Sequence, residues 1–291
     1  MTDSTATEAS TPPAPPSNTA ATPFGFRPRD QAHHETSLRA LSVQSGQQCK
    51  RILIKWSRDP VTLAQSLLYP ALMVLMFRLV LGESISERTG VSSSYGMVPM
   101  VALVGAMAGA SVSGIGLRRE LAGGMLHKFW TMPVHRSSAL LGRLCAEVVR
   151  ILVTTVLIFV VGTFIGFRIE TGIPGLLGML GVAVLFGISF SIMVTAITLL
   201  TNKSTITEWI AITTNLLMFF NSGFVPVDAY PTWLQPVVEY QPLSCAVDAI
   251  RGLALNGEIA RPMFLTCAWS VGILAVFLRP AVIGYRKASR K

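Results

Sequence analysis

Residues 173–200 of this chain read IPGLLGMLGVAVLFGISFSIMVTAITLL and contain no charged side chain. A helix needs about 20 residues to cross the hydrocarbon core of a bilayer, so this stretch is long enough to span a membrane. Five further stretches have the same apolar character. The sequence therefore predicts an all-α integral membrane protein with six transmembrane helices, at 61–82, 97–117, 148–167, 173–200, 208–225 and 262–284.

The composition agrees with this class. Of the 291 residues, 51% are hydrophobic and 13% are charged, whereas ordinary soluble domains carry about 25% charged residues. The net charge of +9 would suggest a nucleic-acid partner in a soluble protein, but here Lys and Arg gather at the ends of the predicted spans. We interpret these charges as topology signals and expect no nucleic-acid partner.

The basic residues also predict an orientation. Lys and Arg are dense before the first span, between the second and third spans, and in the tail that ends at Lys291. Because positive charge is retained on the inner side of a membrane, we expect both termini to be cytoplasmic and the protein to lie in the cell (plasma) membrane. Residues 1–34 are rich in Thr, Ala, Ser and Pro and precede a membrane domain over 35–291, so we expect a disordered cytoplasmic tail there.

Residues 37–58 have the pattern of an amphipathic helix at the membrane surface. One face is apolar and carries Cys49, Ile52, Leu53 and Trp56. Another face is basic and carries Arg51, Lys55 and Arg58. Asp59-Pro60 ends this helix, because proline cannot continue the hydrogen-bond ladder. The alternative is a linker next to the membrane whose charges only set the topology.

The basic connection 117–147 carries a second short helical pattern. Its apolar face is formed by Leu121, Met125, Leu126, Phe129 and Trp130, and Pro133 ends it. An exposed apolar stripe on a cytoplasmic loop suits docking to a protein partner, but it also suits contact with lipid. The periodicity leaves these two alternatives open.

The connection after the fifth predicted span has its own pattern. Pro231 and Pro242 each stand where a helix could begin. Residues 242–255 form one apolar face, over a length too short to span a bilayer. We therefore expect a short re-entrant helical hairpin that dips into the outer leaflet, with Asp248 and Arg251 paired on its polar side.

The sequence lacks the motifs of several common enzyme and nucleotide-binding sites. The sequence has no G-x-x-x-x-G-K-[ST] phosphate loop and no G-x-S-x-G or H-E-x-x-H motif. Acidic residues lie only at the edges of the predicted spans, which disfavours a proton- or sodium-driven carrier. We expect no enzyme activity and no metal or cofactor in this chain. The four cysteines lack metal-ligand spacing, and whether Cys245 and Cys267 pair stays open.

From about residue 38 to the end, the chain resembles the ABC-2 class of ABC-transporter permeases. The resemblance is carried by the segment from Arg119-Glu120 to Met132-Pro133, by the stretch from Gln241-Pro242 to Arg251, and by the ending Ile283-Gly284-Tyr285-Arg286. These segments look like the actinobacterial, including mycobacterial, daunorubicin/doxorubicin-resistance permeases. One departure is the segment 121–124, where relatives often carry a more polar turn.

The resemblance implies an assembly. A cytoplasmic coupling helix at 119–130 would dock into a separate ATP-binding cassette subunit, which would hold ATP and Mg, and an N-terminal elbow helix would lie beside it. A second permease, identical or paralogous, would complete the pathway, and the outer hairpin would cover it. The coupling residues would be Arg119, Glu120, Leu121, Gly124, Met125, Leu126, Phe129 and Pro133. The elbow residues would be Ile52, Leu53, Trp56 and Arg58, and the hairpin residues Pro231, Trp233, Pro242, Asp248 and Arg251.

The resemblance also implies a function. Such relatives export amphipathic drugs or cell-wall lipids, so we expect an efflux permease for antibiotic resistance or lipid transport. Residues of the fifth span are candidates for contact with the cargo, although packing between helices explains them as well. They are Thr213, Thr214, Asn215, Phe219, Phe220 and Asn221. The alternatives are a non-transporting membrane scaffold for an ATPase and a membrane-embedded lipid-modifying enzyme.

Overall fold

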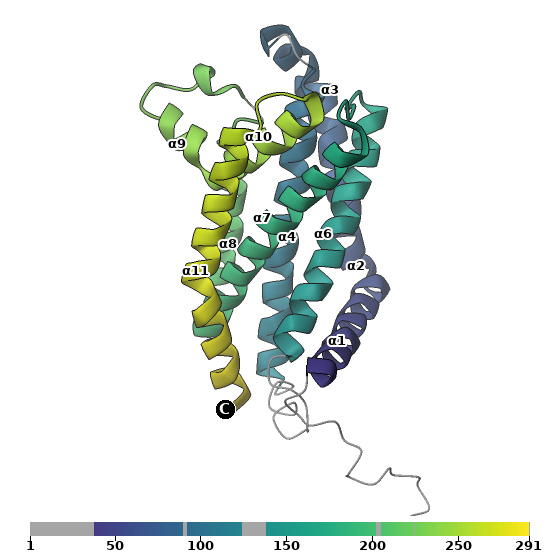
Figure 1. Ribbon diagram of the computed structural model, residues 1–291, viewed down its shortest axis with the longest axis vertical. Helices are drawn as coiled ribbons and strands as arrows, with labels where there is room; N and C mark the ends of the chain where they lie inside the picture. The colour runs from purple at the N-terminus through teal and green to yellow at the C-terminus, as the bar shows by residue number, and fades with distance from the viewer. Residues whose placement is uncertain (1–37, 90–91, 124–137, 202–204, 224, 291) are drawn as a thin grey trace, which may run out of the picture. The chain divides into compact units, whose positions relative to one another are not determined.

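The computed structural model describes residues 38–89, 92–123, 138–201, 205–223 and 225–290, and all regular structure in these ranges is helical (Figure 1). Five segments within them are long and apolar enough to cross a membrane. They are Pro60–Val80, Ser94–Ala122, Ser138–Phe164, Gly172–Leu200 and Ala260–Tyr285. These segments confirm the first, second, third, fourth and sixth predicted spans, and they identify a multi-pass membrane protein. The predicted tail 1–34 lies outside the described residues.

The fifth predicted span is shorter than expected. It corresponds to α8 (Thr205–Phe219), which has 15 residues, fewer than the roughly 20 that cross a bilayer. The helix ends because Asn221 turns the backbone. Its side chain donates to the carbonyl of Met218 and accepts from the N–H of Gly223 at 2.7 Å. The prediction of a helix reaching Val225 was therefore wrong.

The first span is built from three pieces: α2 (Pro60–Leu63), the π-helix η2 (Ala64–Leu68) and α3 (Tyr69–Thr89). Asp59 caps the start of the span by accepting from the N–H of Val61 at 3.1 Å. In the π-turn, the N–H of Tyr69 donates to the carbonyl of Ala64, five residues earlier. The next residue is Pro70, which has no N–H and whose ring would crowd the preceding turn of an α-helix. We attribute the wider turn to this proline.

The amphipathic helix forms as predicted. Helix α1 (Leu38–Arg58) ends directly before Asp59-Pro60 and lies along α6 (Ser138–Phe164) (Figure 1). The two backbones approach closely at Gly142, where a Cβ atom would lie 2.8 Å from the carbonyl oxygen of Ser45. Cys49 on the apolar face is buried. At least part of this face therefore packs on protein.

Helices α4 (Ser94–Ala122) and α7 (Gly172–Leu200) pack on each other and form the centre of the bundle. Both also contact α6 and α10. Small residues permit these approaches: a Cβ atom on Gly187 of α7 would lie 2.6 Å from Cδ1 of Ile151 in α6.

The remaining elements are η3 (Val227–Ala229), α9 (Gln235–Tyr240), α10 (Pro242–Leu255) and α11 (Ala260–Arg290). Helix α10 has the predicted bounds and ends at Asn256, whose φ of 51° is left-handed. Its apolar face, including Leu243, Val247 and Ile250, is fully buried against α4, α7 and α11. The protein core therefore covers this face, and the expectation that the hairpin dips into the outer leaflet stays a prediction.

The two ends of the bundle differ in what lies there (Figure 1). The end of the bundle at which α4, α7 and α11 finish is also the end near which α1 lies, and we call it the α1 end. The segment that contains α9 and α10 lies at the opposite end, which we call the α10 end.

Candidate functional site

Three helices meet at Glu120, in the last turn of α4. Its carboxylate lies 2.5 Å from Nη2 of Arg143 in α6, 3.9 Å from Nζ of Lys55 and 4.0 Å from Nη2 of Arg51, both in α1. Arg143 is only 6% exposed and also donates to the carbonyl of Ser113 at 3.0 Å. A buried guanidinium needs a partner charge, whereas the exposed Lys55 and Arg51 gain little from theirs. We call this group the Glu120 junction; it ties the end of α4 to α1 and α6.

The predicted coupling residues divide into two groups. Arg119, Glu120 and Leu121 belong to α4, which runs without a break to Ala122. The other members, Gly124, Met125, Leu126, Phe129 and Pro133, lie outside the described residues. The Glu120 junction therefore lies at the α1 end, at the start of the segment 119–130 for which docking is predicted.

A second ion pair lies inside a span. Oε2 of Glu147 is 2.9 Å from Nε and 2.5 Å from Nη2 of Arg150, one turn later in α6. Both side chains are buried, with 5% and 6% exposed. Nη2 of Arg150 also reaches the carbonyl of Ala106 in α4 at 3.3 Å.

This pair corrects the expectation that acidic residues lie only at span edges. The predicted third span began at 148, but α6 begins at Ser138, so Glu147 lies well within it. The available signal was the spacing: an acid and an arginine three residues apart on one helix neutralise each other and can be carried into a span.

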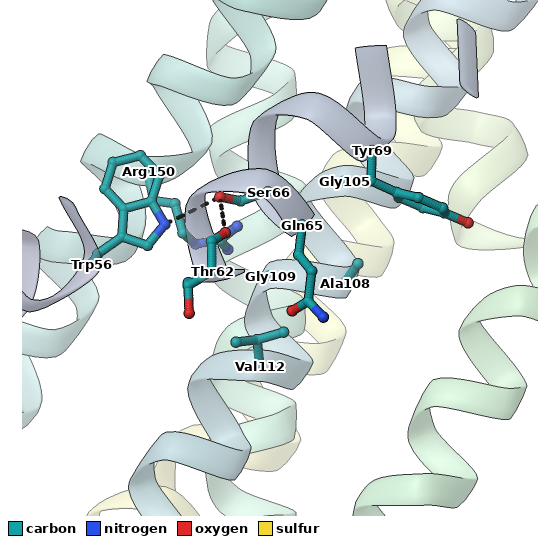
Figure 2. A pocket seen from close by; sticks show the side chains of 10 residues that line it. All are labelled: Trp56, Thr62, Gln65, Ser66, Tyr69, Gly105, Ala108, Gly109, Val112 and Arg150. Atoms are coloured by element: carbon teal, nitrogen blue, oxygen red, sulfur yellow. Dashed lines mark hydrogen bonds between the residues drawn. The ribbon is translucent and has the colours of Figure 1, made fainter. Parts of the chain in front are cut away.

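A pocket of about 330 Å³ lies beside this pair, bounded by residues of α1, α2, η2, α3, α4 and α6. Figure 2 shows Arg150 at its back and Tyr69 on the opposite side. The elbow residue Trp56 forms part of the wall, and its indole N–H donates to Oγ of Ser66 at 3.2 Å. Ser66 in turn donates to the carbonyl of Thr62 at 2.6 Å. The wall between α1 and η2 is thus held by a short hydrogen-bond chain.

The elbow residues of α1 take different environments. Trp56, Ile52 and Leu53 are half-buried, whereas Arg58 is exposed at the last residue of the helix. The apolar and basic faces predicted from the periodicity are therefore separated as expected.

At the α10 end, Asp248 joins α10 to the turn after α8. Its Oδ1 is 2.7 Å from Nη2 of Arg251, the predicted ion pair, and accepts from Oγ of Ser222 at 3.0 Å. Burial raises the pKa of the Asp248 carboxyl above its ordinary value, while the charge of Arg251 and the Ser222 hydrogen bond oppose that rise.

Other predicted hairpin residues lie on the surface. Pro231 and Trp233, in the connection between η3 and α9, are exposed, whereas Pro242 is half-buried at the start of α10. The hydroxyl of Tyr230 donates to the carbonyl of Phe219 at 3.2 Å, which holds this connection against the end of α8.

The candidates for contact with cargo are not brought onto one surface. Thr213, Phe219 and Phe220 are exposed, whereas Thr214 and Asn221 are buried. The side chain of Asn215 lies outside the described ones. Asn221 serves the backbone turn that ends α8, which is a structural role.

Neither a metal cluster nor a disulfide is found within the described ranges. No three His, Cys, Asp or Glu side chains there lie close enough together to hold a metal ion. All four cysteines are free thiols, so Cys245 and Cys267 are not paired.

The long apolar helices, with a charged junction at the end of α4 and a buried ion pair in α6, define a polytopic α-helical membrane protein. The sequence profile described as ABC-2 type transporter matches residues 44–255, most of the chain. This chain therefore belongs to the ABC-2 type transporter family, and it is a permease subunit with no ATPase domain in the matched region.

Named relatives agree with this assignment. The chain is 36% identical over 255 residues, 88% of its own length and 92% of the relative's, to the probable doxorubicin resistance ABC transporter permease protein DrrC of Mycobacterium tuberculosis, in strains CDC 1551 / Oshkosh and H37Rv. It is 26% identical over 228 residues, 78% of this chain and 80% of the relative, to the daunorubicin resistance ABC transporter permease protein DrrB1 of Streptomyces coeruleorubidus.

Proposed function

We propose that this chain is the permease subunit of an exporter that moves amphipathic drugs or cell-wall lipids out of the cell. ATP and Mg would be bound by a separate ATP-binding cassette subunit. The observation that carries the proposal is the similarity, over 88% of the chain, to a permease named for doxorubicin resistance. A second relative is named for daunorubicin resistance, which favours the same class of cargo.

The topology forms part of this proposal. The α1 end would face the cytoplasm, both termini included, in the plasma membrane. Helix α7 finishes at the α1 end and α11 begins at the α10 end (Figure 1). The chain has to return across the membrane between them, and α8 would make that sixth crossing together with the turn after it. The α9–α10 segment would then cover the outer side of the pathway.

Coupling to the ATPase would run through residues 119–130. The Glu120 junction supports this role, because it ties the base of that segment to α1 and to α6. A displacement of this segment by the ATPase would thereby be transmitted to α1 and to the membrane helices α4 and α6. Two permeases and two ATPases would form the working unit.

Docking can be tested by replacing Met125, Leu126 and Phe129 with Ala. We expect capture of the ATPase subunit by the permease to be lost while membrane insertion is retained. Ile115→Ala, at an exposed apolar site on α4, is the matched control. Unchanged capture by the triple variant would contradict the docking role.

Export itself needs a transport measurement. Inverted membrane vesicles that contain the permease and its ATPase should accumulate daunorubicin or a lipid cargo only with Mg-ATP. If the ATPase binds but no candidate cargo moves, the scaffold alternative is favoured. The native mass of the extracted complex would show whether the second permease is identical.

The cargo would contact α8. Thr213, Phe219 and Phe220 are the members of the predicted set with exposed side chains. Replacing each with Ala should change cargo preference without releasing the ATPase, whereas Asn221→Ala should mainly destabilise the turn after α8.

A further inference from the structure

We propose that Cys49 and Cys145 form an oxidation site, at which a peroxide joins helices α1 and α6 by a reversible disulfide. The site uses none of the residues considered for docking or for contact with cargo. Three observations carry the inference: the line along which the two helices touch, the contact between the two thiols, and the unequal exposure of these thiols.

Helices α1 and α6 touch along a line that can be followed from two contacts (Figure 1). At the first, a Cβ atom on Gly142 of α6 would lie 2.8 Å from the carbonyl oxygen of Ser45 and 3.3 Å from the backbone nitrogen of Cys49. At the second, Trp56 of α1 and Arg150 of α6 line the same pocket (Figure 2). Residue numbers increase in the same direction on both helices between these contacts.

Both cysteines stand on this line. Cys49 follows Ser45 by four residues and Cys145 follows Gly142 by three, and these spacings keep residues on one face of a helix. The thiol of Cys49 is hydrogen-bonded to the thiol of Cys145, so the two sulfur atoms are already in contact. A disulfide requires two backbones that approach closely, and the packing at Gly142 provides this approach.

The exposure of the two thiols differs, and the difference assigns their roles. Cys145 is exposed, whereas only 7% of Cys49 is exposed. Burial is also the main reason that the pKa of Cys49 is raised to about 11, so little of this thiol is ionised at neutral pH. A peroxide therefore reacts first at Cys145, and Cys49 is the thiol that resolves the product.

The reaction needs a peroxide as its oxidant and proceeds in two steps. Hydrogen peroxide oxidises the Cys145 thiol to a sulfenic acid and is itself reduced to water. The sulfur of Cys49 then attacks the sulfenic sulfur. The S–S bond forms, the S–O bond breaks, and the hydroxyl leaves as water with the proton of Cys49. The second step is intramolecular, and the contact between the two side chains favours it.

The bond would fix α1 to a membrane span close to the Glu120 junction. Arg51 and Lys55, which contact Glu120, follow Cys49 on α1 within two turns. Intracellular disulfides are mostly transient and redox-sensing, which suits a thiol pair at the end proposed to face the cytoplasm. The consequence for transport rests on the proposed function, in which a displacement of the coupling segment reaches α1. The oxidised permease would export no cargo until a reductant breaks the bond.

A peptide map tests the bond on the permease alone. The full-length chain, with one copy in each nanodisc, is treated with hydrogen peroxide, alkylated, denatured and digested with trypsin without reductant. Cleavage after Lys and Arg releases Cys49 in the peptide 40–50 and Cys145 in the peptide 144–150. We expect these peptides to appear linked, about 2 Da lighter than their sum, and to separate after reduction.

Matched variants test the roles of the two thiols. In Cys145→Ser, the peptide 40–50 should stay free, because the buried Cys49 does not react with peroxide by itself. In Cys49→Ser, the sulfenic acid on Cys145 should persist and be trapped by dimedone. Cys145→Ser combined with Val153→Cys keeps an exposed thiol on α6 but moves it eight residues, about 12 Å, along the helix. This thiol should be oxidised without linking to Cys49.

Three results would overturn the proposal: a peptide 40–50 that stays free while Cys145 is oxidised, a peptide 144–150 that links only to its own copy, or an equal yield of the linked peptides when the chain is denatured before oxidation. Cys145→Ser changes an exposed side chain, so the comparison does not depend on the folding of Cys49→Ser.

The effect on export is a separate measurement. In vesicles that also hold the ATPase, peroxide should abolish Mg-ATP-dependent accumulation of cargo by the wild type but not by Cys145→Ser, and reductant should restore it. Accumulation that persists in the linked wild type would refute the effect of the bond on export. Absence of accumulation before oxidation would instead count against the proposed function, whereas the bond itself is decided by the peptide map.

Discussion

Gly96 in α4 and Gly223 in the turn after α8 meet backbone to backbone. A Cβ atom on Gly96 would overlap the carbonyl oxygen of Gly223, and one on Gly223 would lie 2.8 Å from the carbonyl oxygen of Gly96. The neighbouring residue Ser222 bonds both Ser244 and Asp248 of α10. The start of α4, the end of α8 and α10 are therefore held at one point.

Gly96→Ala should destabilise the protein by about 1–3 kcal/mol, because the added methyl group meets backbone that cannot move aside. The measurement is thermal unfolding of the detergent-extracted protein, followed by loss of the monodisperse peak. Gly116→Ala is the control, since a Cβ atom there meets nothing within 4 Å. Equal melting temperatures for the two variants would refute the close contact.

Glu120→Gln should lower the free energy of unfolding by about 3–5 kcal/mol, because it leaves the buried Arg143 without its counter-charge. Arg119→Gln, in the same turn but exposed, should have little effect. A double variant that also carries Arg143→Gln should recover part of the loss. Equal melting temperatures for Glu120→Gln and Arg119→Gln would show that the ion pair of Glu120 and Arg143 does not hold α4 to α6.

Asp248 should make stability depend on pH. Its folded-state pKa lies above the ordinary value of 3.8, so protonation is favoured in the folded state. The stability it contributes is present below pH 3.8 and is lost as the pH rises through the folded pKa. Melting temperatures from pH 3.5 upward, for wild type and Asp248→Asn, should diverge over that window in favour of the variant. A constant difference would contradict the raised pKa.

The thiol of Cys49 should react slowly with maleimide at neutral pH. Burial, and then its hydrogen bond and charge interaction with Cys145, raise its pKa to about 11. Its thiolate fraction, and with it the initial rate of maleimide modification, should increase about thirtyfold from pH 7.5 to pH 9. Peptide-resolved mass spectrometry would follow it against the exposed Cys145. An increase of only about eightfold, which levels off towards pH 9, would show an ordinary thiol of pKa about 8.5.

Local patterns predicted much of the fold. The bounds of α1 and α10 follow from Asp59-Pro60, Pro242 and Asn256, because caps and prolines act on the chain next to them. Long apolar stretches similarly predicted five of the spans, since the length that crosses a bilayer is fixed.

Contacts between distant segments could not be predicted in this way. Asn221 looks like a polar residue of a span, but it ends α8 through bonds to the turn that packs on α10. The apolar face of α10 looks ready for lipid until α4 and α7 are known to cover it. The pocket likewise requires α1, η2, α4 and α6 to be placed together. Of these features, only Pro70, which follows the widened turn, is visible in the sequence.

The placement of Glu147 and Arg150 on one helix has a consequence for biogenesis. A span that enters the bilayer with a lone charge would wait for a partner helix to be synthesised. Here the partner is three residues away in the same segment, so neutralisation needs no other part of the chain. The pair of Glu147 and Arg150 can therefore form as soon as α6 is synthesised. The ion pair of Glu120 with Arg143, in contrast, requires both α4 and α6.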